Sequence, residues 1–311
     1  DMRILFMGTP EFAVPCIKAL KDSEHTLCGA VTQPDKPAGR GHKLTPPSVK
    51  KFALENGIEV FQPQTLKDRA FESDLKRLDP EMIIVVAYGK ILPEYILNYP
   101  KFGCINMHAS LLPKYRGAGP IQWAVINGEK KTGITSMMME KGLDTGDMLL
   151  KCETEIGEYE TASELHDRLM YMGAELMLET IRGVENGTIE PKKQDDSLSC
   201  YAPMINKEKA KIDWNKPAED IIHLIHGMNS WPVAHTLYEG TRLRVYRAKK
   251  GALHSAGQPG EIVNVSNDGI EVVGGDGAGV VLTEVQFEGS KAMSVRDYLN
   301  GHEVRSGVVL S

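Results

Sequence analysis

The chain has few cysteines, and their spacing does not suggest a site. Five occur among 311 residues, and no two are close enough to form a Cys-x-x-Cys pair. An odd number of scattered cysteines argues against a disulfide framework and a cysteine-based zinc site, and favours reduced thiols in the cytoplasm. The five are Cys16, Cys28, Cys104, Cys152 and Cys200.

Long apolar runs are also missing. No stretch approaches the roughly 20 apolar residues needed to span a bilayer. No secretory leader pattern precedes the first predicted strand, at residues 3–7, so we expect neither a membrane protein nor a secreted one. That strand is not followed by G-x-G-x-x-G, so the fingerprint of a dinucleotide-binding site is absent.

Acidic residues outnumber basic ones, giving a formal net charge of −6, and this balance does not favour nucleic-acid binding. The basic residues nevertheless gather in two clusters. Such clusters are usually solvated surface, but two of them on an acidic chain keep a polyanionic partner as an open alternative. One cluster comprises Lys36, Arg40, His42, Lys43, Lys50 and Lys51, and the other comprises Arg242, Arg244, Arg247, Lys249 and Lys250.

The composition, 41% apolar and 25% charged, is that of a globular protein with one large domain or two ordinary ones. In the first part of the chain, predicted strands alternate with helices, which indicates an α/β doubly wound, Rossmann-like sheet. Thr9 is expected to cap the first helix, with Pro10 at its first position. The predicted strands are 3–7, 25–33, 83–87, 104–107 and 133–139, and the predicted helices are 10–21, 121–126 and 162–182.

The pattern changes after the last of these helices. We expect a domain over 1–189, a polar, irregular linker over 190–206 and a second domain over 207–311. After a helix at 218–228, short strands separated by turns predict a small oligonucleotide-binding-type β-barrel. These strands are expected at 242–247, 260–265, 269–273 and 279–283.

Three polar residues carry the chemistry that the sequence suggests. Asn106 and His108 lie two apart at a predicted strand end, so they face the same side, and Asp144 follows in a glycine-rich stretch. An amide can donate to a developing oxyanion, an imidazole can move a proton, and a carboxylate can orient the imidazole. Taken singly, the His is more often structural and the Asp could be an Asx-turn residue.

Another pair of histidines could suggest a metal. His223 and His226 are three apart on a predicted helix, but no third ligand is nearby in the sequence. We therefore interpret them as residues on the surface of that helix and expect no metal site.

The motifs together resemble those of formyltetrahydrofolate-dependent formyltransferases, and within them the bacterial methionyl-tRNA formyltransferases. The likeness covers nearly the whole chain. The catalytic triplet is shared across the wider family, whereas the insertion at 34–40 and the C-terminal domain narrow the choice. The motifs are Asn106-x-His108, Ser110-Leu111-Leu112-Pro113, Arg116-Gly117, Leu143-Asp144-Thr145-Gly146, the stretches 6–13, 32–41 and 86–89, and Gly227-Met228-Asn229-Ser230-Trp231-Pro232.

The resemblance implies that the α-amine of methionyl initiator tRNA attacks the formyl carbon of 10-formyltetrahydrofolate. Asn106 and His108 would stabilise the oxyanion, and Asp144 would support His108. Whether His108 is chiefly proton carrier or oxyanion stabiliser stays open. The implied folate-binding residues are Tyr88, Gly89, Lys90, Ile91, Leu92, Ser110, Leu111, Leu112, Pro113, Met139, Glu140 and Leu143.

The resemblance also implies a tRNA partner, with the loop at 34–47 entering the acceptor-stem region and the barrel holding the inside of the L. A flexible solvated loop is the alternative. We expect a cytoplasmic monomer. The implied tRNA-binding residues are Arg40, Lys43, Lys207, Arg242, Arg244 and Arg247.

Three positions depart from the family pattern. Met204 stands where a lysine is common, which bears on the linker's tRNA contact, while Ser230 and Val233 replace a usual Pro and Gly. Rival functions also remain: a formyltransferase for an amino sugar or a purine precursor, a formyltetrahydrofolate hydrolase or folate-binding regulator, and a pure RNA-binding protein.

Overall fold

The computed structural model describes residues 1–38, 41 and 43–311. These residues form two compact units. The first unit comprises 1–117, 133–154 and 166–201, and the second comprises 118–132, 155–165 and 202–311. Two segments from the middle of the chain therefore belong to the second unit.

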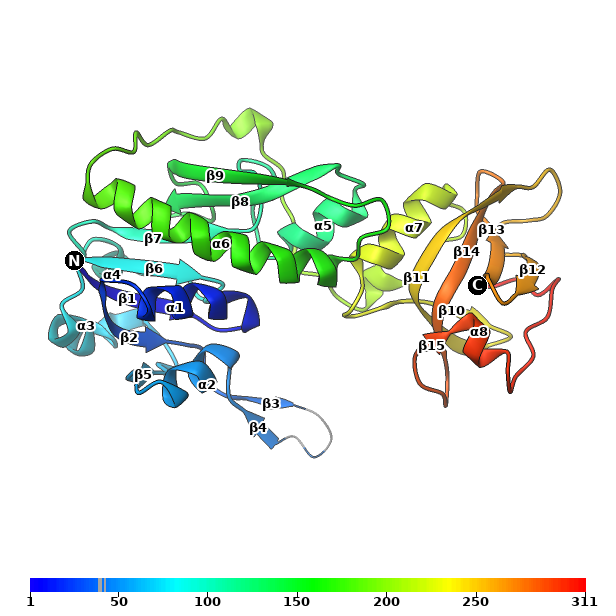
Figure 1. Ribbon diagram of the computed structural model, residues 1–311, viewed down its shortest axis with the longest axis horizontal. Coiled ribbons are helices and arrows are strands. Elements are labelled where there is room, and N and C mark those ends of the chain that lie inside the picture. The colour runs from blue at the N-terminus through cyan, green and yellow to red at the C-terminus, as the bar shows by residue number, and fades with distance from the viewer. Residues whose placement is uncertain (39–40, 42) are drawn as a thin grey trace. The chain divides into compact units, whose positions relative to one another are not determined.

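A seven-stranded sheet forms the centre of the first unit (Figure 1), in the order β5-β2-β1-β6-β7-β8-β9. The strands from β5 to β7 are parallel, and β8 runs antiparallel to β7. The prediction of a doubly wound, Rossmann-like sheet is confirmed. The strands are β1 Arg3–Gly8, β2 Thr26–Val31, β5 Val60–Phe61, β6 Met82–Val86, β7 Cys104–His108, β8 Lys131–Met138 and β9 Met148–Glu155.

Strand β6 is buried on both faces because it is apolar at every position, and β1 is buried from Ile4 onward. Leu5 of β1 and Ile83 of β6 pack in one cluster with Leu75 of α3. Towards the β9 edge of the sheet, Thr180 of α6 donates a hydrogen bond to Ser136 of β8 at 2.8 Å. The helical segments are η1 Glu11–Ala13, α1 Val14–Lys21, α2 Ser48–Glu55, η2 Lys67–Arg69, α3 Glu72–Leu78, α4 Glu94–Leu97, α6 Ala162–Glu185 and η3 Asp196–Leu198.

The predicted cap of the first helix is wrong. Pro10 is the N-cap residue of a short 3-10 helix, no side chain caps that helix, and the α-helix begins only at Val14. The Thr9 hydroxyl instead donates to the Tyr88 carbonyl at 2.9 Å and accepts from the Gln33 amide at 3.2 Å. Thr9 therefore ties together the ends of three strands, a role that local sequence cannot reveal.

The loop at 34–47 contains a hairpin that the sequence analysis did not predict. Strand β3 (Lys36–Ala38) pairs antiparallel with β4 (Lys43–Thr45). Lys43 is exposed on β4, and Arg40 lies outside the described residues.

An antiparallel sheet forms the second unit, in the order β10-β11-β14-β13-β12, with β15 paired to β14. The chain end closes it: Ile262 of β12 donates to the Val308 carbonyl at 2.8 Å, and Leu237 of β10 donates to the Ser311 carbonyl at 3.0 Å. The prediction of a small β-barrel in this part of the chain is confirmed as an antiparallel sheet to which the chain end bonds at β10 and β12. The strands are β10 Ala234–Tyr238, β11 Thr241–Leu253, β12 Ile262–Ser266, β13 Gly269–Val273, β14 Ala278–Phe287 and β15 Met293–Ser294.

Helix α7 (Ala218–Gly227) packs against both this sheet and α5 (Pro120–Ile126). The two helices approach closely at Gly227, where a Cβ would lie 2.3 Å from Ile126 Cγ1. Two short helices, η4 (Glu208–Ala210) and α8 (Val295–Tyr298), complete the unit.

Val233 has a backbone conformation that glycine adopts without strain. Its φ is 76°, in the left-handed region that a β-branched residue adopts only with strain. Its side chain is buried, so packing holds it there.

His226 is buried in α7, not on its surface as we expected. Its side chain is 1% exposed, Nε2 accepts from the Ala248 amide at 3.2 Å, and Nδ1 has no partner among the described residues. Burial, reinforced by the charge of Arg247, lowers the pKa of His226 to about 4 from 6.5.

This buried histidine predicts acid sensitivity. Because the folded-state pKa lies below the unfolded-state value, the unfolded chain binds more protons between pH 6.5 and pH 4, and stability is lost as pH falls through that window. From pH 7 to pH 5 we expect a loss of about 2 kcal/mol of unfolding free energy through His226. His226→Gln should remove this loss.

Urea unfolding followed by tryptophan fluorescence measures the effect, because Trp123, Trp214 and Trp231 all lie in the second unit. The exposed His302 provides a control, and His302→Gln should keep the wild-type pH dependence. An unchanged pH dependence in His226→Gln would contradict the prediction.

Candidate active site

The carboxyl ends of β1, β6 and β7 meet at one edge of the parallel sheet. The register pairs Gly8 with Val86 and Val85 with Asn106, so the residues that follow these strands come together. Ligands of open α/β sheets bind at such edges. Here a Cβ at Gly89 would lie 2.2 Å from Gln33 Nε2, and the φ of Gly89 is 92°, so only glycine suits this turn.

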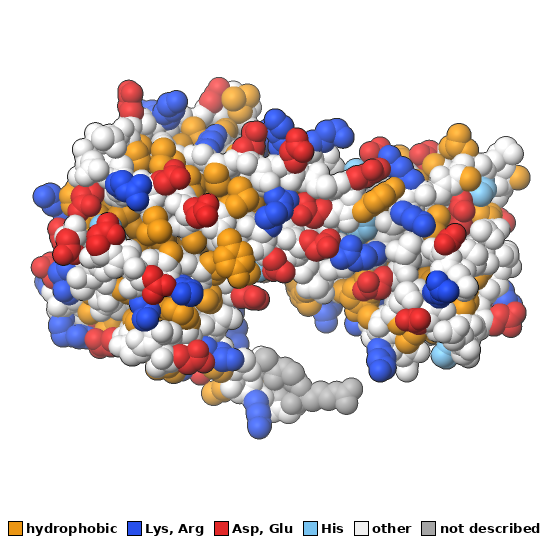
Figure 2. Space-filling view, in the orientation of Figure 1, with side chains coloured by type: hydrophobic (Ala, Val, Ile, Leu, Met, Phe, Trp, Pro, Cys, Tyr) orange, Lys and Arg blue, Asp and Glu red, His pale blue; other side chains and the backbone are white. Residues whose placement is uncertain are grey.

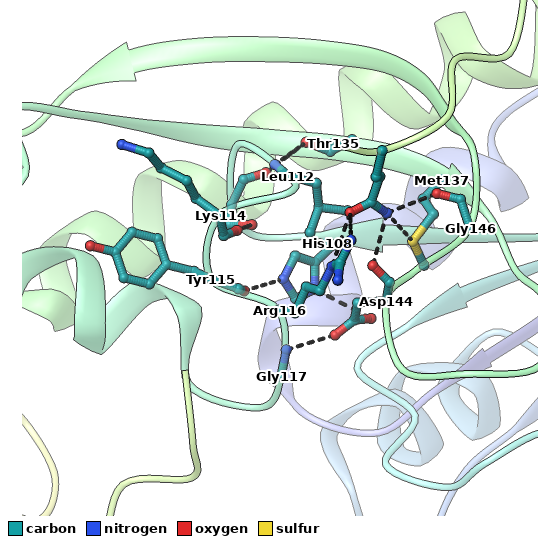
Figure 3. A network of polar contacts seen from close by, with 12 residues as sticks. His108, Leu112, Lys114, Tyr115, Arg116, Gly117, Thr135, Met137, Asp144 and Gly146 are labelled. Carbon is teal, nitrogen blue, oxygen red and sulfur yellow. Dashed lines mark hydrogen bonds and ion pairs between the residues drawn. The ribbon is translucent and has the colours of Figure 1, made fainter. Parts of the chain in front are cut away.

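His108 is held at both ring nitrogens (Figure 3). Nε2 lies 2.7 Å from the Tyr115 carbonyl oxygen, and because a carbonyl can only accept, Nε2 must carry a hydrogen. Nδ1 lies 3.8 Å from Asp144 Oδ1. Both groups are buried. This second contact is an ion pair only when His108 takes up a second proton, so the carboxylate stabilises the charged ring.

Asp144 is fixed in the loop between β8 and β9. Its Oδ2 accepts from the Gly117 amide at 2.8 Å. Its φ is 57°, in the left-handed region. The loop turns tightly, since a Cβ at Gly146 would lie 1.7 Å from the Met138 carbonyl oxygen. The glycine-rich stretch thus allows the backbone to present the carboxylate to His108.

Asn106 lies on β7, two positions before His108, and is partly exposed. Among the described residues, none forms a hydrogen bond with its side chain. The amide is therefore available to donate to a ligand, as an oxyanion-binding group must be.

The segment after β7 folds into a buried loop. Thr135 Oγ1 donates to the Ser110 carbonyl at 2.7 Å and accepts from the Leu112 amide at 3.1 Å, while the Ser110 hydroxyl donates to the Lys114 carbonyl at 2.6 Å. Ser110 and Leu112 are fully buried. These contacts shape the loop that delivers the Tyr115 carbonyl and the Gly117 amide.

The expected folate-binding residues divide by exposure. Ile91 and Leu143 are large apolar side chains that are 88% and 55% exposed, which makes them free to contact a ligand. Lys90 is tied to the Pro63 and Gln64 carbonyls at 2.8 and 2.7 Å. Tyr88 and Leu92 are buried, and Leu111, Pro113 and Met139 are partly exposed. Gly89 and Glu140, which follow strand ends, are both exposed.

The expected tRNA-binding residues also differ in their surroundings. Lys207 and Arg242 are exposed and Arg244 is partly exposed. Arg247 forms ion pairs with Glu164 at 3.1 Å and Glu284 at 3.8 Å.

The sequence analysis missed Gln194 and gave no role to Arg116. Gln194 bonds to the loop that carries Asp144. Arg116 bonds to Gln194 and precedes Gly117, whose amide binds the Asp144 carboxylate. Gln194 lies in the stretch interpreted as a linker. The motif Arg116-Gly117 was noticed, but its link to Gln194 depends on residues far apart in the chain and has no local signal.

In the described part of the chain, no group of three or more His, Cys, Asp or Glu is arranged to hold a metal ion. Within the same residues, no helix combines the length and apolar character needed to cross a membrane.

The formyl transferase family model matches residues 2–181, and the model of the family's C-terminal domain matches 204–303. The chain therefore belongs to the formyl transferase family. Its relatives include methionyl-tRNA formyltransferases of Alkaliphilus oremlandii, 52% identical over 99% of both chains, and of Clostridium novyi, 51% identical over 99% of this chain and 100% of the relative.

One solved structure shows the same fold. An N-formyltransferase of Helicobacter canadensis, in complex with folinic acid and dTDP-3-aminofucose, matches with a TM-score of 0.68 at 20% identity, covering 91% of this chain and 99% of its own.

Proposed function

We infer that this protein transfers the formyl group of 10-formyltetrahydrofolate to the α-amine of methionyl initiator tRNA, giving formylmethionyl-tRNA for translation initiation. The observation that carries this inference is identity of about half to methionyl-tRNA formyltransferases over nearly the whole chain. The arrangement of Asn106, His108 and Asp144 supports the same chemistry.

In the proposed reaction the methionyl amine attacks the formyl carbon, and the carbonyl oxygen becomes an oxyanion. The Asn106 amide donates to that oxyanion, and the charged His108 ring stabilises it from the buried side. When the intermediate collapses, the bond from the formyl carbon to N10 of the folate breaks, and the proton lost by the amine goes to N10. Asp144 keeps the His108 ring oriented throughout.

The folate would lie beside this site, at the edge where β1, β6 and β7 end. Exposed Ile91 and Leu143 offer apolar contacts to its ring system, and backbone groups near Gly89 and Glu140 are suited to hydrogen bonds. Ser110 and Leu112 act by shaping the adjoining loop, because both are fully buried.

We further propose that the tRNA contacts come from the hairpin at 34–47, including Arg40 and Lys43, from Lys207 and from Arg242, Arg244 and Arg247. Catalysis would be the role of residues 1–189 and RNA binding that of 207–311, with 190–206 between them. On the face shown in Figure 2, basic and acidic groups are interspersed, so on that face local contacts, rather than a broad positive field, would bind the tRNA. We also propose that the protein acts as a monomer in the cytoplasm.

Arg244 offers a test of the RNA contact. Among the described residues it forms no ion pair, unlike Arg247, so its charge is available to a phosphate. Arg244→Ala should raise the KM for methionyl-tRNA, leave the KM for the folate unchanged, and reduce the slope of log KM against log salt by about 1. Steady-state kinetics at several salt concentrations measure this.

Arg296→Ala, an exposed arginine on α8, is the matched control and should behave as wild type. Equal loss of salt dependence in both variants would contradict a specific contact at Arg244.

A formyl-transfer assay tests the function itself. 10-formyltetrahydrofolate is supplied with methionyl initiator tRNA, uncharged tRNA, free methionine or an amino-sugar nucleotide. Product with the charged tRNA alone is expected. Formylation of the amino sugar, or formate release without an acceptor, would overturn the tRNA assignment while keeping the folate chemistry.

A further inference from the structure

We propose that Gln194 is a positioning residue for the reaction, acting through Asp144. It lies between α6 and η3, fifty residues after Asp144 in the chain. The inference rests on the proposed function, because it assumes that Asp144 supports His108 during formyl transfer.

The side-chain amide of Gln194 is bonded at its nitrogen to the Asp144 loop and at its oxygen to Arg116. Its nitrogen also lies 3.8 Å from Met137 Sδ. Nε2 donates to the carbonyl oxygens of Asp144 and Gly146, both at 2.8 Å. Oε1 accepts from Arg116 Nε at 3.1 Å and from Arg116 Nη2 at 3.0 Å. The amide orientation is therefore fixed: turning it over would set its oxygen against two carbonyl oxygens.

These contacts matter because the Asp144 backbone is in an unfavourable conformation. The left-handed region is less favourable than the right-handed one for an L-residue, although aspartate adopts it more readily than most, so contacts from outside the loop help to hold Asp144 there. Two ties are present: the Gly117 amide holds the Asp144 carboxylate at 2.8 Å, and Gln194 holds the peptide carbonyl of the same residue. If the second tie is lost, the backbone can relax and carry the carboxylate away from His108.

Arg116 completes the arrangement (Figure 3). It precedes Gly117, so the residue that fixes the Gln194 amide is a neighbour of the residue that binds the Asp144 carboxylate. Arg116 also pairs with Asp196 at 2.7 Å. Gln194 thereby connects the loop after β7 with the loop after β8, and both loops contribute to the surroundings of His108.

Two substitutions separate the donors of Gln194 from its acceptor. Gln194→Glu keeps an acceptor for Arg116 but places a carboxylate against the Asp144 and Gly146 carbonyls. Gln194→Leu removes both functions at similar size. We expect each to lower kcat by about 10–100-fold, because misplacing a catalytic group by about 1 Å can cost 10²-fold. The KM for the folate and for methionyl-tRNA should change less than about threefold.

The control is Asp196→Asn, which removes the exposed partner of Arg116 and leaves Gln194 intact. Its side chain is 83% exposed, and exposed ion pairs contribute little, so its kcat should stay within about twofold of wild type. Thermal unfolding verifies that each variant is folded, and Gln194→Glu remains informative if the leucine variant is not.

A double-mutant cycle with Asp144→Asn decides whether Gln194 acts through Asp144. If it does, adding Gln194→Glu to Asp144→Asn should lower kcat little further. The Gln194→Glu pH–rate profile should also shift towards that of Asp144→Asn, which a purely structural residue would not cause.

Wild-type kcat in both Gln194 variants, or full additivity with Asp144→Asn, would overturn the inference while leaving the proposed function intact. Wild-type kcat in Asp144→Asn itself would remove Asp144 from the proposed chemistry, and the role of Gln194 with it.

Discussion

Alanine in place of Asn106 should lower kcat for formyl transfer by about 10²–10³-fold, the usual cost of removing one oxyanion donor. The KM for either substrate should change little, because the amide contributes most when the formyl oxygen becomes negative. Stability should stay close to that of wild type, since the described structure gives the Asn106 side chain no hydrogen bond to lose. Steady-state kinetics and thermal unfolding measure the two quantities.

Asn106→Asp refines this test. It has nearly the same shape but places a negative group beside the developing oxyanion, so we expect at least as large a loss of kcat. Asn56→Ala, at the C-cap of α2, serves as a remote control with unchanged kcat. If Asn106→Ala retains kcat within threefold of wild type, Asn106 is not an oxyanion donor.

Asparagine in place of Asp144 is the second change with a large expected effect. Its side-chain oxygen can still accept from the Gly117 amide, so the loop should keep its shape. The neutral amide cannot stabilise a charged His108 ring, whose Nδ1 lies 3.8 Å from Asp144 Oδ1. We expect kcat to fall by about 10²–10⁴-fold, the upper figure being that of a serine-protease triad lacking its aspartate charge.

Asp147→Asn removes a carboxylate from the same loop, three residues later, and should leave kcat unchanged. The rates of the two variants are compared between about pH 5.5 and pH 8.5. Similar rates for the Asp144 and Asp147 variants would show that the loss of charge at Asp144 does not affect the reaction.

Elements set by local pattern could be predicted from the sequence. The apolar runs at 3–7 and 83–87 became β1 and β6, each within a residue or two at its ends. The rhythm of short strands after residue 240 gave the second, antiparallel sheet. Burial on both faces of a parallel strand requires an unbroken apolar run, and this requirement is local.

Features that depend on distant partners could not be predicted. Thr9 looked like a helix cap because threonine commonly is one, yet its hydroxyl contacts Tyr88 and Gln33. His226 looked like a surface residue when only its own helix was considered. Its unit also contains α5, the loop before α6 and strand β11, and the sequence of the helix gives no sign of these segments. Strand β9 and the β3–β4 hairpin carry no strong pattern.

For the site, the motifs suggested the chemical groups but not their arrangement. Asn106, His108 and Asp144 were chosen for their chemical types and for the family resemblance. The site also depends on how three loops pack together. This packing brings the Tyr115 carbonyl to His108 and holds the Asp144 backbone in its left-handed conformation. Local patterns in a single sequence do not encode this packing.

The interleaving of the two units has a consequence for protein engineering. A gene fragment that starts at residue 202 would encode the whole barrel but neither α5 nor the segment 155–165. Its α7 would then present an uncovered apolar strip around Gly227, where Ile126 normally packs. The second unit therefore cannot be transferred as one continuous fragment. A chimera that exchanges it between relatives must also exchange the segments 118–132 and 155–165 from the middle of the chain.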